Sequence, residues 1–226
     1  MVERVPTGVP GLDAQIAGGL PENSVTLVSG GAGTGKTIFC SQFLWHGLEN
    51  DENCLFVTLE EEPDEIKADA EEFDWTFGDY EDDQFKILYI NPFKDSGGFA
   101  DRIREEIDEI DADRVAIDST STMGMYSNEP GKIRERLYSV VRKLRGEQVT
   151  SVITSEVTDG VGSQLSRFGV EEFVADGVVK LTGFSLGDSN FRSLQVVKMR
   201  RTPIEEDICS VGITDDGLTV NTDESL

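Results

Sequence analysis

The chain is poor in the residues that commonly build metal centres and covalent crosslinks. It has three cysteines and a single histidine, His46, among 226 residues. Cys40, Cys54 and Cys209 are far apart and form no CxxC pair, so we predict buried free thiols in a reducing compartment. One histidine cannot supply a multi-histidine metal centre, and we interpret His46 as a packing or helix-surface residue.

Basic residues and long apolar runs are also scarce. The chain has 20 Lys and Arg against 44 Asp and Glu, a net charge of −24. Such a surface repels itself and nucleic-acid phosphates in dilute buffer, whereas molar salt shortens the Debye length to about 3 Å. The composition predicts a haloadapted (halophilic) protein, the alternative being an acidic protein with a basic partner. No apolar run approaches the roughly 18 residues of a membrane span and no signal-peptide pattern opens the chain, so we expect a cytoplasmic protein.

Strand-like apolar runs alternate with segments of helical periodicity until about residue 154. The expected strands span 25–29, 54–59, 85–90, 114–117 and 150–154, and the expected helices 37–48, 63–73, 98–110 and 132–145. Three further strand-like runs, 178–181, 193–200 and 208–213, follow without helices between them. This order predicts a single α/β domain over residues 1–226. Its sheet would be twisted and mainly parallel, with helices on both faces and a C-terminal antiparallel β extension.

The most specific motif lies between the first strand and the first helix. Residues 30–37 read Gly-Gly-Ala-Gly-Thr-Gly-Lys-Thr and fit GxxxxGK[ST] in the strand-then-helix context that a P-loop requires. Small residues let consecutive backbone N–H groups converge on an anion, and the helix N-terminus adds a partial positive charge. The predicted nucleotide-binding residues are Gly30, Gly31, Ala32, Gly33, Thr34, Gly35, Lys36, Thr37 and Ile38. Lys36 would reach the β- and γ-phosphates and the Thr37 hydroxyl would ligate Mg²⁺; the alternative is a glycine-rich turn with a surface lysine.

A second oxygen ligand for Mg²⁺ is expected at the end of another strand. The apolar run 114–117 is followed directly by Asp118. Ligands of open α/β sheets bind outside the carboxyl ends of the strands, so Asp118 would face the same crevice as Lys36. We predict Thr37 and Asp118 as the metal-binding residues; the alternative is that Asp118 caps the polar turn that follows it.

Three consecutive glutamates follow the second expected strand. Glu60 and Glu61 should lie at the same sheet edge, where the γ-phosphate of a bound nucleotide would project. A carboxylate there can polarise a water for in-line attack, and a second negative charge would raise its proton affinity. We predict Glu60, Glu61 and Lys36 as the catalytic residues, against the alternative that the strand simply reaches solvent there. Glu62, next to Pro63, is expected to interact with the N-terminus of the following helix.

With these motifs, the chain resembles the KaiC-like branch of the RecA superfamily of ATPases over nearly its whole length. The matching segments are 7–13, 18–21, the P-loop, VTLEEEP at 57–63, VAIDS at 115–119, RFGVEEFVAD at 167–176 and VKMRRT at 197–202. The resemblance implies a RecA-like fold, Mg²⁺-dependent hydrolysis of ATP to ADP and phosphate, and ATP bound between the subunits of a usually hexameric ring. We therefore expect self-association, and a signalling or regulatory role with a protein partner.

The resemblance also implies contacts to the nucleotide of the neighbouring subunit through a Lys-x-Arg motif. The matching residues predict Lys198, Met199, Arg200 and Thr202 for this role. A two-residue spacing puts Lys198 and Arg200 on one face of a strand, and paired cations suit a γ-phosphate; the alternative is two exposed cations that balance the acidic surface. The family commonly continues with Gly-Thr and then His, whereas residues 201–204 read Arg-Thr-Pro-Ile. We therefore do not predict the family's adenine and ribose contacts for this segment.

A second departure concerns phosphorylation. Family members with two tandem domains carry phosphoacceptor hydroxyls in their second domain, in a segment that reads Gly-Val-Glu-Glu-Phe here (169–173). The chain is thus more similar to the hydrolysing first domain, and autokinase activity is not predicted.

Six cations crowd the expected helix 132–145 and flank its apolar stripe: Lys132, Arg134, Arg136, Arg142, Lys143 and Arg145. They could form a subunit contact or pair with acids of the chain itself, bind nucleic acid, or bind another acidic partner. The net negative charge opposes nucleic acid. The candidate functions are, in order, a ring ATPase, a nucleotide-gated scaffold with little turnover, and a recombinase-like DNA-binding filament.

Overall fold

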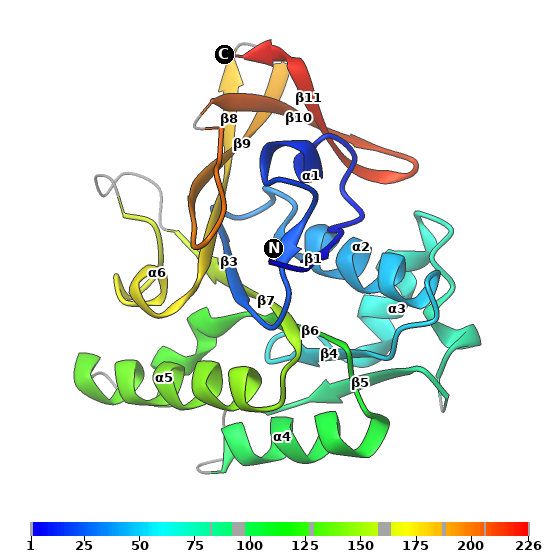
Figure 1. Ribbon diagram of the computed structural model, residues 1–226, viewed down its shortest axis with the longest axis vertical. Coiled ribbons are helices and arrows are strands. Elements are labelled where there is room, and N and C mark those ends of the chain that lie inside the picture. Colours follow the sequence, from blue (N-terminus) through cyan, green and yellow to red (C-terminus); the bar gives the residue numbers. More distant parts are fainter. Residues whose placement is uncertain are drawn as a thin grey trace.

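The computed structural model describes residues 2–81, 83–91, 98–126, 129–157, 164–186, 189–205 and 207–225. These residues contain a nine-stranded sheet of order β11-β10-β9-β8-β3-β7-β6-β4-β5 (Figure 1). Its parallel part consists of β3 (Val25–Gly30), β4 (Cys54–Thr58), β5 (Phe85–Tyr89), β6 (Arg114–Asp118), β7 (Thr150–Glu156) and β8 (Gly177–Leu186). The predicted mainly parallel sheet is confirmed.

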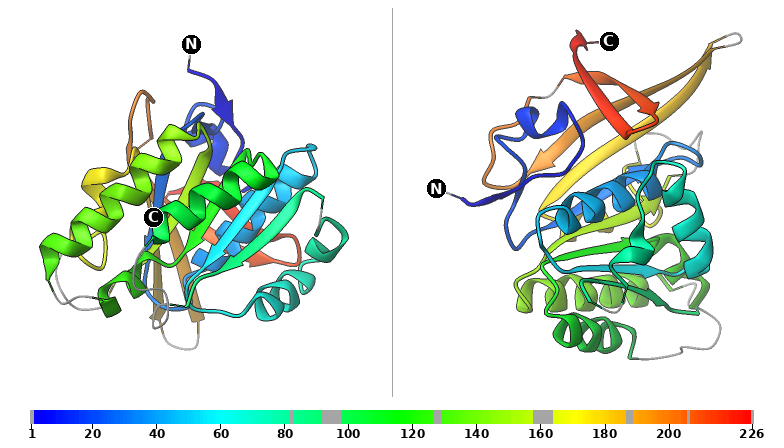
Figure 2. Two further views of the ribbon diagram at one scale, coloured as in Figure 1. Left: turned by 90° about the horizontal axis from the view of Figure 1, so that it is seen from below. Right: turned by 90° about the vertical axis from the view of Figure 1, so that its right-hand side faces the viewer.

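Helices cover both faces of the parallel strands, as predicted (Figure 2). One face carries α2 (Lys36–Leu48) and α3 (Pro63–Glu71), and the other carries α4 (Phe99–Ile110) and α5 (Pro130–Gly146). Alternate residues of a strand point to opposite faces. Val28 of β3 therefore packs in the core under α2, whereas its neighbour Leu27 packs in the core under α4 and α5. The central residues of β4 (55–57) and β6 (115–117) form continuous apolar runs because both faces of these strands are buried.

The antiparallel extension is formed by β8, β9 (Ser189–Met199), β10 (Ile208–Thr214) and β11 (Gly217–Ser225). The sequence predicted the first three of these strands but not β11. That strand has few apolar residues, and among its side chains that the structure describes, Leu218 and Val220 lie in the core. Its position is set by pairing with β10 across a tight turn at residues 214–217.

Small elements that carry little periodicity were not predicted. They are β1 (Arg4–Val5), α1 (Leu12–Gln15), β2 (Leu20–Pro21), α6 (Glu171–Val174) and the 3₁₀ segments η1 (Phe77–Asp79) and η2 (Thr120–Tyr126). The three cysteines are buried free thiols, as predicted. In the part of the chain that the structure describes, no helix is both long and apolar enough to cross a membrane.

The basic helix α5 pairs partly with acids of its own chain. Lys143 contacts Asp101 of α4 at 2.8 Å, and Arg145 contacts Asp176 at 2.9 Å. Lys132 pairs with Glu129 at the start of the helix. At least three of the six cations therefore have an intramolecular partner, which supports the salt-bridged interpretation of this helix.

Candidate nucleotide-binding site

The P-loop joins β3 to α2 through a backbone that small residues make possible. Gly33 and Gly35 have φ angles of 69° and 100°, in the region that favours glycine. A Cβ on Gly30 would lie 2.6 Å from the carbonyl oxygen of Leu181 and from Thr34 Oγ1, so this position is closed to larger residues. Thr34 closes the loop by donating a hydrogen bond from Oγ1 to the Gly31 carbonyl at 2.9 Å.

The first turn of α2 presents the predicted lysine and hydroxyl on the loop. Lys36 Nζ donates to the Gly31 carbonyl at 2.8 Å, which places its charge over the loop itself. Thr37 Oγ1 donates to Asp118 Oδ2 at 2.6 Å. Ile38 is half-buried and packs against the core. Two chain segments, the start of α2 and the end of β6, thus bring an ammonium group, a hydroxyl and a carboxylate to the same edge of the sheet.

Asp118 ends β6 and faces the P-loop across the crevice. Its second oxygen, Oδ1, accepts a hydrogen bond from Thr154 Oγ1 of β7. The turn after Asp118 makes its own hydrogen bond, from Thr122 Oγ1 to the Ser119 carbonyl. The Asp118 carboxylate accepts its hydrogen bonds from Thr37 and Thr154. These contacts differ from those expected of an aspartate that caps the following turn.

Glu60 and Glu61 both lie close to Asp118, because β4 ends at Thr58 and the chain turns. The Thr58 hydroxyl donates to the Glu61 carbonyl at 2.8 Å, which fixes this turn. Ser119 Oγ donates to Glu60 Oε1, so Glu60 is tied to the residue after Asp118. Burial raises the pKa of Glu61, and the charges of Asp118, Asp69 and Glu60 raise it further. The coupling expected between the two glutamates therefore acts on Glu61.

Glu62 has a structural role, as the sequence predicted. It is the N-cap of α3 and forms a capping box with Glu65, whose carboxylate accepts from the Glu62 N–H at 3.1 Å. Pro63 occupies the first turn, where its missing N–H costs no hydrogen bond. The three consecutive glutamates therefore have two roles: Glu60 and Glu61 lie at the crevice, and Glu62 caps a helix.

Lys198 and Arg200 lie away from the P-loop of their own subunit. The ladder pairs Met199 with Gly177, which pairs with Thr26 at the start of β3, whereas Gly30 is four residues further along that strand. At about 3.3 Å per residue, this is roughly 13 Å along the sheet. The predicted cations therefore do not join the crevice of their own chain.

Both cations are engaged with the segment around α6. Lys198 Nζ donates to the carbonyls of Glu172 and Ala175 at 2.8 and 2.7 Å, and burial, followed by the charge of Arg200, lowers its pKa. Arg200 Nη1 is 3.3 Å from Asp176 Oδ1. Both side chains contact the segment at residues 172–176, although Arg200 lies one residue beyond the end of β9.

The two remaining residues of the predicted trans group occupy different surroundings. Met199 is buried. Thr202 Oγ1 accepts from Arg4 Nη1 at 2.6 Å and donates to the Arg200 carbonyl at 3.2 Å.

Three residues of the crevice escaped sequence reasoning. Ser119 and Thr154 orient the carboxylates described above. Arg192 of β9 donates from Nε to the carbonyl of Gly33 at 3.3 Å, so the antiparallel arm contacts the P-loop. Thr154 ends an expected strand beside β6, which is a usable signal, whereas the position of Arg192 depends on the register of β9.

The P-loop between a buried strand and a helix, with a threonine hydroxyl facing a strand-end aspartate, defines the class of P-loop nucleotide-binding proteins. The comparisons with known proteins refine this class. A family model described as "ATPase: KaiC" matches residues 5–225. The chain belongs to this KaiC family, in the RecA superfamily of ATPases.

Individual relatives agree with this assignment. A UPF0273 protein of Methanopyrus kandleri is 35% identical over 97% of this chain and 92% of its own. The circadian clock oscillator protein KaiC of Prochlorococcus marinus is 36% identical over 97% of this chain but only 45% of its own length. The crystal structure of a KaiC-like protein of Pyrococcus horikoshii superposes with a TM-score of 0.88 at 34% identity, covering 98% of this chain and all of that one.

Proposed function

We propose that the protein binds Mg²⁺·ATP in the crevice beside the P-loop and hydrolyses it to ADP and phosphate. The observation that carries this proposal is the 2.6 Å contact between Thr37 and Asp118, with Lys36 on the same loop. These three groups come from two segments, α2 and β6, and together they match the lysine, hydroxyl and carboxylate that hold a triphosphate and its metal in P-loop enzymes.

The donor set suits magnesium. Thr37 and Asp118 supply oxygen ligands, which Mg²⁺ prefers, and Mg²⁺ in nucleotide enzymes takes its other ligands from phosphates and water. Among the described residues no group of three or more His, Cys, Asp and Glu side chains could hold a metal alone. When bound, the ion would neutralise charge on the β- and γ-phosphates, and Lys36 would add a second positive charge from the loop.

The glutamate pair is proposed to accept the proton of the attacking water. Both carboxylates lie near Asp118, and Glu61 has a raised pKa, which suits a base that must take up a proton. Interacting carboxylates titrate as a pair, so we assign the proton to Glu60 and Glu61 together. The hydrogen bond from Ser119 would hold Glu60 in place during this step.

The active assembly is proposed to be a homohexameric ring with ATP at subunit interfaces. In support, Lys198 and Arg200 are remote from their own P-loop, and both contact the segment at residues 172–176, where a neighbour can meet them. We further propose a haloadapted cytoplasmic protein of one domain with a signalling or regulatory partner. A relative named as a clock oscillator protein supports a regulatory role.

The test is phosphate release from Mg²⁺·ATP at molar salt by wild type, Glu60→Gln, Glu61→Gln and the double variant. We expect each single change to lower kcat by about 100-fold or more, and the double variant to lose little further, because the two act as a unit. Glu105→Gln, an exposed change on α4 across the sheet, is the matched control.

Equal rates for all variants would exclude the catalytic role. ATP binding without turnover in wild type would instead favour the nucleotide-gated scaffold. Salt-tolerant binding of single-stranded DNA would be required for a recombinase-like function, and we expect none at this net charge.

A further inference from the structure

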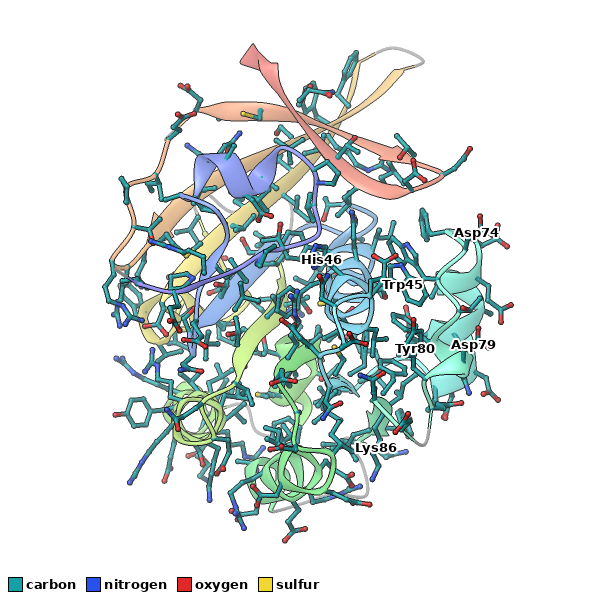
Figure 3. All side chains as sticks on the ribbon, turned by 45° about the vertical axis from the view of Figure 1, so that its right-hand side comes forward. Trp45, His46, Asp74, Asp79, Tyr80 and Lys86 are labelled. Carbon is teal, nitrogen blue, oxygen red and sulfur yellow. The ribbon has the colours of Figure 1, made fainter. Side chains whose placement is uncertain are left out.

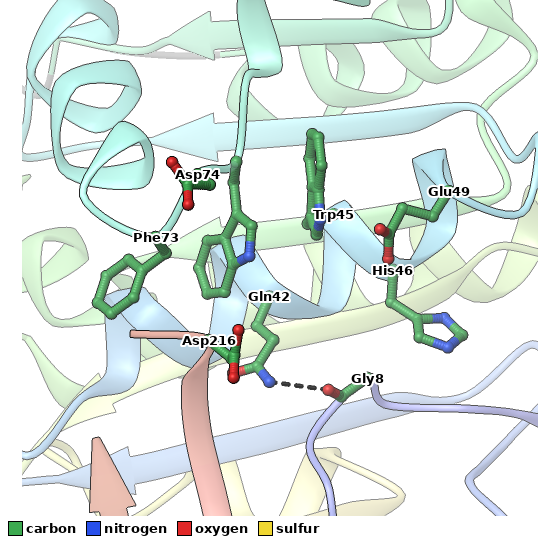
Figure 4. A pocket seen from close by; sticks show the side chains of 9 residues that line it. Gly8, Gln42, Trp45, His46, Glu49, Phe73, Asp74 and Asp216 are labelled. Atoms are coloured by element: carbon green, nitrogen blue, oxygen red, sulfur yellow. Dashed lines mark hydrogen bonds between the residues drawn. The ribbon is translucent and has the colours of Figure 1, made fainter. Parts of the chain in front are cut away.

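A pocket of about 320 Å³ opens beside the later turns of α2 (Figure 4). Its walls come from the N-terminal segment, α2, the segment after α3 and the turn between β10 and β11. Trp45 of α2 lines the pocket and is nine residues beyond Lys36, which is roughly 13 Å along the helix. The pocket therefore lies beside the nucleotide crevice but is separate from the P-loop residues.

Gln42 fixes the wall where these segments meet. Its Nε2 donates to the Gly8 carbonyl at 2.8 Å (Figure 4). The same nitrogen donates to the Leu218 carbonyl at 3.1 Å, and Oε1 accepts from the Leu218 N–H at 2.8 Å. Because both ends of the amide are already bonded, Gln42 holds the wall together and offers little to a ligand. A Cβ on Gly217 (φ 102°) would lie 2.7 Å from the Trp75 ring, so the turn approaches this indole closely.

Both tryptophans of the chain line this pocket, and aromatic neighbours hold each one in place. Trp45 meets Phe77 and Tyr80 edge-on, at centroid distances of 5.9 and 5.8 Å. Trp75 stacks on Phe73 at 4.7 Å and is only 5% exposed. Within the described residues, the Trp75 indole N–H has no acceptor, although it is not sealed from the pocket. A buried indole N–H normally finds a partner, so this one is available to a ligand.

The charge of the pocket is negative. Glu49, Asp74 and Asp216 line it as exposed side chains, and no lysine or arginine is among its lining residues, all of which the structure describes. His46 adds no positive charge near neutral pH, because burial, followed by the charge of Arg114, lowers its pKa. Indole faces attract cations, and carboxylates add to that attraction.

We propose that this pocket binds the side chain of an arginine residue in a protein segment. A guanidinium is planar, stacks on indole rings and donates several hydrogen bonds to carboxylates, which a lysine ammonium does less well. A backbone carbonyl beside the arginine would accept the free Trp75 N–H. The volume is at the small end for ligand sites, which suits one side chain. We assign the segment to another, basic protein, because a second copy of this chain would bring its own net charge of −24 toward these carboxylates.

Intrinsic fluorescence tests this directly, since both emitting indoles line the pocket. Wild type is titrated with Nα-acetyl-arginine amide at the lowest salt that keeps the protein folded, and Nα-acetyl-citrulline amide serves as the uncharged isostere. We expect a saturable change in emission with a Kd on the order of a millimolar. Citrulline amide should bind at least about five-fold more weakly. An equal response to both compounds, or no response to either, overturns the proposal.

Three charge-neutralising variants locate the effect. Asp74→Asn and Asp216→Asn should each weaken arginine amide binding by about two- to five-fold. Asp79→Asn removes an equally exposed charge from nearby η1, outside the pocket, and should leave binding unchanged (Figure 3). All three positions are exposed, so the variants should fold like wild type, which thermal unfolding checks. An equal loss in Asp79→Asn would show general charge attraction and contradict the site.

Two further titrations identify the source of the arginine and separate the pocket from the nucleotide crevice. If another protein supplies it, emission without peptide should stay constant across the protein concentrations at which light scattering shows assembly. An emission change in step with light scattering, reduced in Asp74→Asn, would place an arginine of a second copy in the pocket and overturn this assignment. Competition of ADP with arginine amide, together with weaker ADP binding in Asp74→Asn, would make the pocket part of the nucleotide site and overturn the proposal.

Discussion

The two groups of charged residues predicted to meet a nucleotide differ in how their polar atoms are occupied. At the crevice, Thr37 and Asp118 bond to each other across two segments, and Lys36 lies on its own loop. At the far end of β9, Lys198 donates to two carbonyls near α6, and Arg200 pairs with Asp176. The crevice is assembled within one chain, whereas the second group is engaged elsewhere.

This difference teaches which part of the site depends on assembly. At the crevice, the Thr37 hydroxyl and the Asp118 carboxylate already face each other, as two ligands of one metal ion would. Lys198 must leave two carbonyls before it can contact a phosphate, and burial already lowers its pKa. A neighbouring subunit that brings a phosphate close would compensate for those lost hydrogen bonds. Without such a neighbour, the cations remain structural.

The largest effect should come from Lys36→Ala at the crevice. Removing the only lysine of the P-loop deletes the charge closest to the transferred phosphate, so we expect kcat/KM to fall by about 1,000-fold. Phosphate release and ATP binding by calorimetry measure this. Lys86→Ala is the matched control: this β5 lysine pairs with Glu106 and Glu109 and lies outside the crevice (Figure 3). An active Lys36→Ala protein would remove the crevice from the mechanism.

The crevice was predictable because its motifs are local. Spacing alone identified residues 30–37, and the rule that strand ends converge placed Asp118 and the glutamates beside them. The register of β9 was not readable, so the contact of Arg192 with Gly33 was missed. Strand β11 and the pocket beside α2 depend on tertiary packing of segments distant in sequence, such as Gln42 with Leu218. Local pattern carries no information on such contacts.

Asp118→Asn should have the next largest effect, because it removes one of the two predicted metal ligands but keeps the shape of the side chain. We expect the Mg²⁺ concentration for half-maximal activity to rise by about 10- to 100-fold. Magnesium titration of phosphate release at fixed ATP provides the measurement. The neighbouring Ser119→Ala change should alter kcat with little shift in the Mg²⁺ midpoint, since Ser119 contacts Glu60 and not the predicted metal ligands. Equal shifts in both variants would contradict the separation of roles.

Lys198→Met tests the second group, Lys198 and Arg200. We expect kcat to fall by about 10- to 100-fold, which is no more than the usual effect of losing one hydrogen-bond donor to the transition state. Mixing this variant with Lys36→Ala sharpens the comparison. If sites form between subunits, the mixture contains interfaces with an intact P-loop from one chain and an intact Lys198 from the other. About a quarter of the interfaces should then be active at equal amounts. A mixture no more active than its components would place both residues in one subunit's site or leave Lys198 structural.

The smallest expected effect is on the free energy of unfolding, through the charge of Glu61. A raised pKa means that folding favours the protonated form of Glu61, so its negative charge destabilises the fold at neutral pH. Glu61→Gln should therefore raise the free energy of unfolding at pH 7.5, by less than about 1 kcal/mol because the side chain is only half-buried and solvent screens its charge. The gain should shrink as pH falls through the raised pKa and vanish near about 4.3, the ordinary value for glutamate. Denaturant unfolding across this range measures it. Glu105→Gln, an exposed change across the sheet, should show no such pH dependence. A gain in Glu61→Gln that persists at low pH would show that packing, not charge, is responsible.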